Sequence, residues 1–334
     1  MIINEIKLSK QFLIFGDEVV IVTNHGKISI KENWSKDLVE KLNEKLKDFE
    51  INSAEDFSKL KEILKELNFH KYFVIEAAII NNTKQVWRFF NPSVVQIPRP
   101  IYIALSKNTG AKQFVIFSLN ANNFDAVLTA GRKIADFVKK KESYLDNIKE
   151  EQLLMLIKEA IDIEHEFTNF ELRIGVIFNN FIDGKYNYLD SKLDPIQQFD
   201  FVSKLIEKYS VAYVENPFVE NDLAMYEKLN KRCKSSSLIC MNSKVNEYTE
   251  GINKQAFNAL VAKFTDVPSF ATEINFFKDN NINIVADFSS EYTDVVVGLG
   301  IPLIKINDDK IGNEISKKLK IIADDILDYK NKLN

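Results

Sequence analysis

One short stretch, residues 211–216, limits most strongly what this chain can fold into. An apolar, partly β-branched run ends there in a single carboxylate, Glu215, and Pro217 follows two residues later. Such a run is typical of a buried parallel strand, because a strand covered on both faces has no polar side to turn to water. Proline then interrupts the ladder of hydrogen bonds, since it has no N–H to donate. In a barrel of parallel strands, the carboxyl end of a strand is where chemistry is carried out.

Composition excludes several classes of partner and compartment. The 334 residues carry 44 basic and 48 acidic side chains, a net charge of −4, so neither nucleic acid nor an anionic membrane surface is expected as a partner. Two cysteines are too few for a disulfide framework and are expected to be free thiols in a reducing compartment. Because no signal peptide and no apolar run of about 20 residues is recognised, we expect a cytoplasmic protein.

The first part of the chain, residues 1–97, predicts a separate small α+β unit. Short β-branched or aromatic runs predict an antiparallel meander, at residues 12–14, 19–22 and 28–30, with turns around Gly16 and Gly26. Helical spacing of apolar residues follows, from Ser35, from Ser53 and over residues 73–89. Pro92, Pro98 and Pro100 mark a linker to the rest of the chain.

The second part, residues 98–334, predicts a barrel with an unusual beginning. Two apolar runs, residues 101–105 and 114–117, are separated by a short turn and therefore predict an antiparallel hairpin. Two helices follow, over residues 125–141 and 153–163. From there strand and helix patterns alternate, as expected of a parallel barrel.

The stretch around Glu215 resembles the strand of enolases that carries one of their magnesium-binding carboxylates. Further segments resemble enolases in the same order along the chain, at residues 172–179, 183–189, 258–264, 284–291 and 300–306. The resemblance implies an enolase-type (β/α)8 barrel with an antiparallel start, preceded by a small α+β N-terminal domain. It also implies a homodimer.

The resemblance further implies where three magnesium ligands would stand. Only Glu215 is retained, while Ile177 and Met241 occupy the other two ligand positions and Asn216 replaces the Asp that follows the glutamate. Magnesium requires hard oxygen ligands in near-octahedral geometry. We therefore expect no metal site and no cofactor, with magnesium as the cofactor only if some activity remains.

The same resemblance assigns two lysines to the catalytic positions. Lys263 matches the base that removes the α-proton, and Lys305 matches the lysine that faces the substrate carboxylate; we interpret both as remnant positions. Gln113 stands where the family has a substrate-facing Glu, and Ser289 is retained as a substrate-binding candidate.

Other parts of the family's site are replaced or missing. Asp287 and Phe288 stand in place of a His and the phosphate-binding Arg, and the glycine-rich lid and the Gly-Asp-Glu-Gly-Gly segment have no counterparts. Ten glycines among 334 residues is well below the usual share of about 7%. Because mobile loops rely on glycine, we interpret this deficit as loop loss, with codon drift as the alternative explanation.

Two functions remain open from the sequence. Without metal ligands the charged enolate lacks its main stabilisation, so we predict a protein that has lost 2-phosphoglycerate dehydration and is kept for binding or assembly with an unidentified protein partner. The alternative is a lyase with residual or altered activity on a small carboxylate or phosphorylated substrate, using Lys263 as base or Schiff-base nucleophile. In either case a buried Glu215 needs a cation, so we predict an ion-pair cluster with Lys263 and Lys305, with Asp287 as a further candidate member.

Overall fold

The computed structural model describes residues 1–9, 18–24, 26–30, 34–69, 72–83, 85–91, 97–108, 110–242 and 245–333. Several predicted features lie outside these residues: the strand at residues 12–14, the turn at Gly16, and Pro92 of the linker. None of the described helices is long and apolar enough to cross a membrane.

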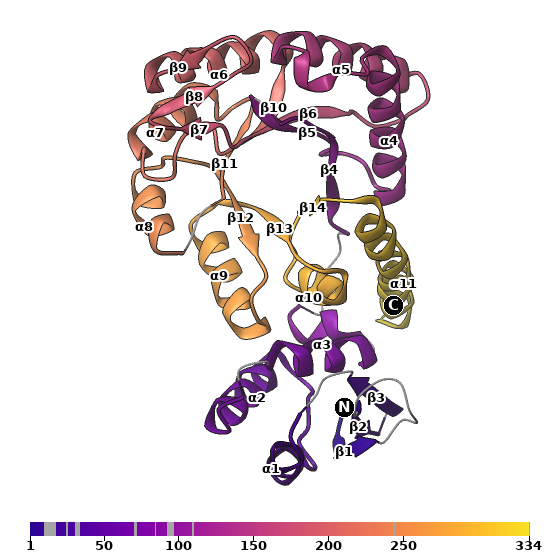
Figure 1. Ribbon diagram of the computed structural model, residues 1–334. Helices are drawn as coiled ribbons and strands as arrows, with labels where there is room; N and C mark the ends of the chain where they lie inside the picture. Colours follow the sequence, from indigo (N-terminus) through magenta and orange to yellow (C-terminus); the bar gives the residue numbers. More distant parts are fainter. Residues whose placement is uncertain are drawn as a thin grey trace.

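The N-terminal unit consists of a small sheet and helices that lie against the outer side of a barrel, next to the barrel helices α9 (Val267–Asp279) and α10 (Thr293–Gly298) (Figure 1). Its antiparallel sheet has the order β1 (Ile3–Ser9), β2 (Glu18–Thr23) and β3 (Gly26–Ile30), so the strands predicted at residues 19–22 and 28–30 are confirmed. The strand β1 was not predicted. Its buried Ile3 and Ile6 are three residues apart across an irregularity in the pairing, so strict alternation is lost and the signal is weak beside the β-branched run of β2.

The helices of this unit follow from their caps and apolar spacing. They are α1 (Lys36–Leu46), α2 (Ala54–Glu66), α3 (Tyr72–Asn82) and the 3₁₀ turn η1 (Val86–Phe89). Ser35 accepts a hydrogen bond from the N–H of Leu38, and Ser53 and Asp56 form a capping box at the start of α2. The single helix predicted over residues 73–89 is wrong at its end, because α3 stops at Asn82 and Gln85 adopts a left-handed conformation with φ 58°.

Eight strands close into a barrel whose second strand runs against its neighbours. In spatial order they are β4 (Arg99–Ser106), β5 (Ala111–Phe117), β6 (Arg173–Phe178), β10 (Val211–Glu215), β11 (Leu238–Met241), β12 (Ala259–Lys263), β13 (Asn283–Asp287) and β14 (Leu303–Ile306). The strand β5 is antiparallel to both β4 and β6, and the remaining neighbours are parallel. The predicted fold class and its antiparallel start are confirmed.

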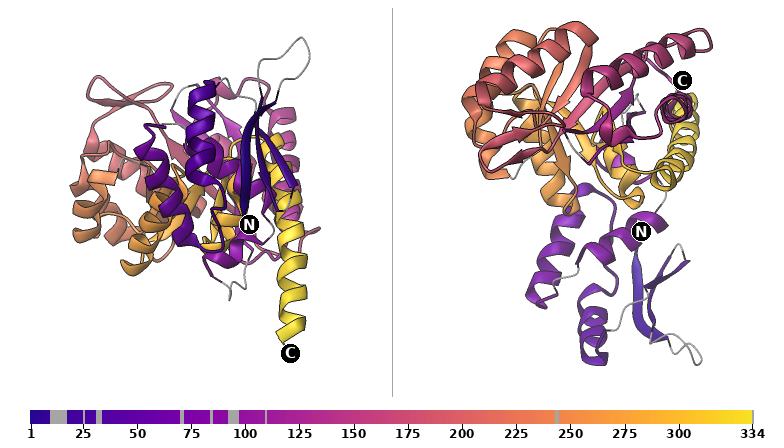
Figure 2. Two further views of the ribbon diagram at one scale, coloured as in Figure 1. Left: turned by 90° about the horizontal axis from the view of Figure 1, so that it is seen from below. Right: turned by 45° about the horizontal axis from the view of Figure 1, so that its top comes forward.

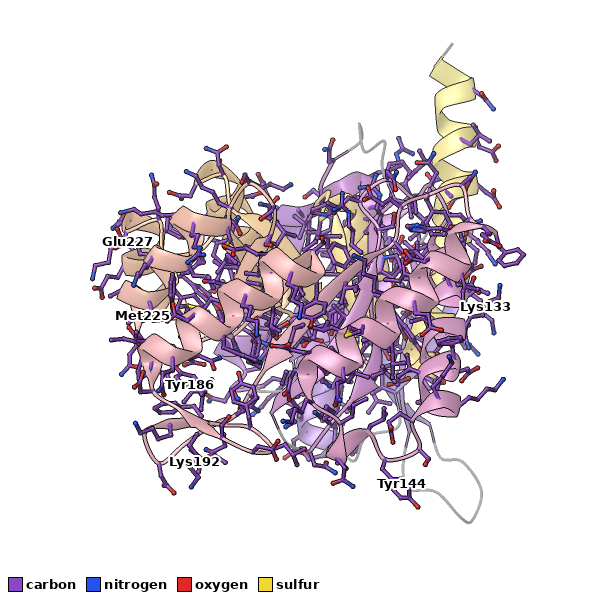
Figure 3. The ribbon with its side chains drawn as sticks, turned by 90° about the horizontal axis from the view of Figure 1, so that it is seen from above. Lys133, Tyr144, Tyr186, Lys192, Met225 and Glu227 are labelled. Carbon is purple, nitrogen blue, oxygen red and sulfur yellow. The ribbon has the colours of Figure 1, made fainter. Side chains whose placement is uncertain are left out.

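Helices cover the outside of the barrel, as Figures 1 and 2 show. They are α4 (Phe124–Lys141), α5 (Glu150–His165), α6 (Pro195–Tyr209), α7 (Leu223–Cys233), α8 (Val245–Asn253), α9 (Val267–Asp279), α10 (Thr293–Gly298) and α11 (Asp309–Leu333). The helix α11 runs beyond the rest of the barrel (Figure 2, left). A small sheet that was not predicted lies between β6 and α6, at the rim of the barrel (Figure 3), and consists of β7 (Phe181–Ile182), β8 (Lys185–Asn187) and β9 (Lys192–Leu193).

The interior of the barrel is filled by side chains that alternate with those facing the helices. Tyr213 is fully buried there, and its ring lies 6.1 Å from that of Phe117 in an edge-to-face arrangement. The neighbouring strand makes room for this ring with Gly175, where an added Cβ would lie 2.8 Å from Cβ of Tyr213. The interior of the barrel is therefore a packed core up to the carboxyl ends of its parallel strands.

Candidate functional site

The carboxyl ends of the barrel strands bring most of the predicted site residues onto one face. Gln113, Ile177 and Glu215 lie opposite one another in the register of β5, β6 and β10. Lys263 and Asp287 are paired in the same way at the ends of β12 and β13. Since the parallel strands all end on this side and the antiparallel β5 begins there, these residues form one ring, which we call the barrel mouth.

Glu215 is buried at the mouth, with 1% of its surface exposed, and both of its oxygens accept hydrogen bonds. The ammonium of Lys305, on β14, lies 2.8 Å from Oε1 and 3.0 Å from Oε2. The hydroxyl of Tyr213 donates to Oε2 over 2.6 Å, and the side-chain amide of Asn242 donates to Oε1 over 2.8 Å. A buried carboxylate with this many donors is satisfied without any further ligand.

Tyr213 and Cys240, which lie deeper in the barrel than Glu215, are held in their neutral forms. Burial raises the pKa of the Tyr213 hydroxyl, and the nearby Cys240 and Glu215 raise it further. Burial likewise raises the pKa of the Cys240 thiol, with a second contribution from the Glu215 charge. The ion pair of Glu215 with Lys305 is thus set on a neutral, packed layer, and neither Tyr213 nor Cys240 is a nucleophile at ordinary pH.

The predicted ion-pair cluster is correct for Lys305 and wrong for the other members. Lys263 is exposed and has no ion pair or hydrogen bond among the described residues. Asp287 accepts a hydrogen bond from the side-chain amide of Asn307 over 3.2 Å instead of approaching Glu215. The physical reason is that Lys305, Tyr213 and Asn242 already occupy the oxygens of Glu215, so nothing draws the outermost residue of β12 inward.

The strand β11 requires a correction of one residue. Met241, predicted at a former ligand position, is fully buried among residues that pack against the surrounding helices, whereas Cys240 belongs to the cluster inside the barrel. Because side chains alternate along a strand, Asn242 is the residue that faces Glu215. Ile177 does face the barrel interior, as predicted, and is 5% exposed.

The two candidate substrate-binding residues lie in different settings. Gln113 is half-buried in the ring beside Ile177, so its amide is in reach of anything bound at the mouth. Ser289 is exposed at the start of the 3₁₀ turn η3 (Ser290–Tyr292), and its hydroxyl interacts with Glu291 of that turn. Phe288, which precedes Ser289, packs into the outer core. The substrate-binding roles of Gln113 and Ser289 stay predictions.

A second buried ion pair, missed from the sequence, lies beside the mouth. Lys107 follows β4, Glu150 opens α5, and the two are 3% and 4% exposed with a distance of 3.1 Å between Nζ and Oε1. Glu150 also accepts from the N–H of Ala111, and Gly110 leaves room for it, since an added Cβ would lie 1.9 Å from Oε1. The turn between β4 and β5 is therefore tied down by a buried charge pair. The two residues are 43 positions apart in sequence, and no local pattern connects them.

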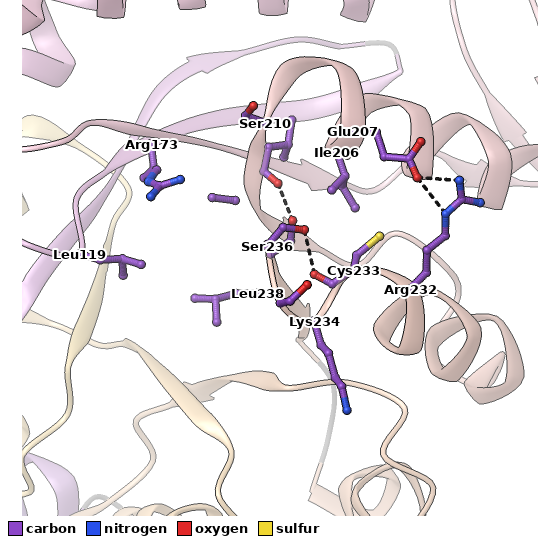
Figure 4. A pocket seen from close by; sticks show the side chains of 14 residues that line it. Leu119, Arg173, Ile206, Glu207, Ser210, Arg232, Cys233, Lys234, Ser236 and Leu238 are labelled. Carbon is purple, nitrogen blue, oxygen red and sulfur yellow. Dashed lines mark hydrogen bonds and ion pairs between the residues drawn. The ribbon is translucent and has the colours of Figure 1, made fainter.

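Two cavities lie near the ends of the barrel. One, of about 450 Å³, is at the edge of the mouth between the small sheet and the loop after β10, and is lined by amides such as Asn179 and Asn216 and by aromatic rings such as Phe181. The other, of about 600 Å³, is at the opposite end of the barrel, among Arg173, Ser210 and neighbouring residues (Figure 4). The second cavity contains none of the predicted site residues.

Comparisons with known proteins agree with the fold. A family model described as the C-terminal TIM barrel domain of enolase matches residues 143–299. The enolase of Natronomonas pharaonis is 25% identical over 193 residues, which cover 53% of this chain and 48% of that protein. The enolase of Sulfurisphaera tokodaii is 22% identical over 266 residues, covering 69% and 64%, and that of Archaeoglobus fulgidus is 24% identical over 241 residues, covering 64% and 59%. The chain thus spans about half to two thirds of the length of these relatives.

Proposed function

Because the chain is a divergent member of the enolase family, we propose that it has lost the dehydration of 2-phosphoglycerate and is kept as a binding or assembly protein. One observation carries this proposal: the ammonium of Lys305 lies on both oxygens of Glu215, the one carboxylate retained from the family's metal site.

The donors at the mouth do not fit magnesium. The other positions facing Glu215 are occupied by Ile177, whose side chain has no atom that can coordinate a metal, and by Asn242, whose side-chain amide is neutral. Within the described part of the chain, no three His, Cys, Asp or Glu side chains gather in a way that could hold a metal ion. A divalent cation beside Glu215 would also meet the positive charge of Lys305 at hydrogen-bond distance.

The remaining groups offer too little stabilisation for the reaction. Removing a proton next to a carboxylate creates a highly charged enolate, and enzymes lower such barriers by about 8 kcal/mol or more. An exposed Lys263 acts in high dielectric, where a single charge contributes only about 1 kcal/mol at 4 Å. Lys305 is already neutralised by Glu215. The chemistry of the family therefore has no electrostatic support at this mouth.

The direct test is an activity assay combined with magnesium titration. We expect the purified chain to turn over 2-phosphoglycerate more than a hundredfold more slowly than an archaeal enolase assayed in parallel, and isothermal calorimetry with MgCl₂ to give no saturable heat. Turnover within a hundredfold of the reference enzyme contradicts the proposal. Restoring the acidic position with Ile177→Asp in the Lys305→Ala background should recover magnesium heat if the mouth is otherwise intact.

A second candidate function rests on Lys263. Its amino group is exposed at the mouth with no ion pair among the described residues, so its neutral form can attack a small carbonyl compound and its ammonium form can bind an anionic substrate. The altered-lyase alternative predicts that borohydride reduction in the presence of pyruvate adds one pyruvate-derived mass to the parent chain and none to Lys263→Arg. If parent and variant are labelled equally, the label is on surface lysines and this alternative fails.

A further inference from the structure

A groove of about 660 Å³ lies where the N-terminal unit meets the barrel, away from the barrel mouth. Its walls come from α2 of the N-terminal unit and from α8 and α9 of the barrel, and α2 lies beside α9 in Figure 1. Volumes of this size, at the junction of two units, are typical of sites for small organic molecules. None of the residues discussed at the mouth contributes to it.

One wall of this groove is aromatic. Tyr248 is 3% exposed and packs edge-to-face on the buried ring of Phe277, with ring centroids 5.3 Å apart. Phe276 stands beside them with 40% of its surface exposed, its centroid 6.0 Å from that of Phe277. The groove therefore offers one exposed aromatic ring, that of Phe276, supported from behind by two buried rings.

The charges on the walls are balanced except for one. Lys61 is paired with Asp266 over 2.7 Å, and Lys65 is paired with Glu62 over 2.9 Å. Glu273, on α9, is half-buried and lines the groove, and no ion pair or hydrogen bond of its carboxylate is found among the described residues. A carboxylate that loses water without gaining a partner is destabilised, and a cation placed in the groove would relieve that cost.

We propose that this groove binds an organic cation with an apolar body, its ammonium group against Glu273 and its apolar part on the exposed ring of Phe276. The uncompensated negative charge selects a cation, and the exposed ring of Phe276 favours one as well, since the face of an aromatic ring attracts positive charge. Neutral and anionic molecules of the same shape would leave the half-buried Glu273 unpaired. The inference goes beyond the proposed function and does not depend on it.

The test uses dansylcadaverine, a fluorescent primary amine, and its N-acetyl derivative, which has the same body without the charge. We expect the full chain to bind the amine at least tenfold more tightly than the acetylated probe, as is usual for a hydrogen bond between charged groups. Glu273→Gln should weaken the amine about tenfold and leave the acetylated probe unchanged. The matched control is Glu62→Gln, a carboxylate on the same groove that is already paired with Lys65, and it should change amine binding less than twofold.

The pH dependence gives a readout that a merely structural role would not produce. Burial raises the pKa of Glu273 to about 7, so its ionised fraction rises about tenfold between pH 6 and pH 8. The other charged groups lining the groove are Lys61, Glu62 and Lys65 on α2. Lys61 is paired with Asp266, which precedes α9, and Lys65 is paired with Glu62. Amine binding should therefore tighten about tenfold from pH 6 to pH 8, and Glu273→Gln should abolish that change.

Three results would overturn the proposal. They are no saturable binding of dansylcadaverine by the parent chain up to 1 mM, equal affinity for the amine and its acetylated form, and unchanged amine affinity in Glu273→Gln. Far-UV circular dichroism establishes that the variant is folded. Phe276→Ala should weaken both probes, because it removes shared apolar surface.

Discussion

At the scale of single residues, the barrel mouth depends on one buried ion pair. Replacing Glu215 with Ala leaves the ammonium of Lys305, 7% exposed, without its counter-charge inside the barrel. Breaking a buried pair on one side typically costs about 3–5 kcal/mol, so we expect the free energy of unfolding in urea to fall by about that amount. Chemical denaturation monitored by circular dichroism measures it.

Two variants control this prediction. Lys263→Ala removes an exposed lysine from the same mouth and should change stability by less than about 0.5 kcal/mol. Replacing the pair together, with Glu215→Leu and Lys305→Met, should cost clearly less than Glu215→Ala, because no isolated charge remains. A Glu215→Ala protein as stable as the parent would mean that Lys305 finds water or another partner.

Glu215 could be predicted because it ends a distinctive apolar strand, and Lys305 because residues 300–306 resemble the enolase strand that carries a lysine. The contact of Tyr213 with Glu215 could also have been predicted, since Tyr213 lies two positions before Glu215 and therefore on the same face of β10. Asn242 was missed by a slip of one residue, which moves a side chain to the opposite face. The pair of Lys107 with Glu150 depends on how distant loops meet, and local patterns contain no information on that.

At the scale of elements, α3 of the N-terminal unit places a carboxylate on the start of α9. Glu76 is fully buried, its Oε2 accepts from the N–H of Val267 over 3.3 Å, and its Oε1 has no hydrogen-bond partner in the described part of the chain. Burial raises its pKa from 4.5 to about 8, with Asp266 adding to the shift and Lys61 opposing it. A neutral Glu76 therefore helps to hold the two elements together at pH 7.

This arrangement predicts that the protein loses stability as the pH rises. The folded state retains the Glu76 proton up to about pH 8, while the unfolded chain releases it near pH 4.5. The stabilisation of the folded state by protonated Glu76 is therefore complete below pH 4.5, declines above it, and is lost once the pH passes 8. The free energy of unfolding changes by up to about 5 kcal/mol over this range. Urea denaturation at intervals from pH 5 to pH 9 measures the slope.

Glu76→Gln is the control, because the amide has the same shape and does not titrate. Burial also raises the pKa of Glu273 to about 7 and that of Asp294 to about 6, and both produce a slope in the same direction. The effect of Glu76 is therefore the difference between parent and variant in the slope of the free energy of unfolding against pH. Identical slopes in the two proteins would show that Glu76 is charged, or reached by water, in the folded state.

Elements with strong periodicity were predicted well, and short ones were not. The long apolar strands and the helices α4 and α5 follow from burial patterns that repeat over many residues. The small sheet of β7, β8 and β9 has strands of two or three residues, too short for a period to show. It is held instead by Tyr186, whose buried ring packs 4.9 Å from that of Phe181.

At the scale of the whole molecule, the N-terminal unit and the barrel meet through backbone as well as side chains. Gly298, the last residue of α10, lies so close to η1 that an added Cβ would be 2.5 Å from the carbonyl oxygen of Trp87 and 2.9 Å from its Cα. Nearby, Lys61 and Asp266 form an ion pair in which the two side chains are 15% and 3% exposed. An interface with this little room is expected to make the two units unfold together.

Gly298→Ala tests that coupling. Alanine in a helix is ordinarily more stable than glycine by about 1 kcal/mol, so the sign of the change separates a helix effect from a clash at the interface. Because the obstructing atoms belong to the backbone of Trp87, we expect destabilisation by about 1–3 kcal/mol.

Tryptophan fluorescence reports on the N-terminal unit, where both tryptophans lie, and far-UV circular dichroism is dominated by the barrel helices. The two signals should coincide in the parent and separate in the variant, with fluorescence changing first. Coincident transitions at an unchanged or higher midpoint would show that the units can shift apart freely, and that the packing of α10 on η1 does not couple them.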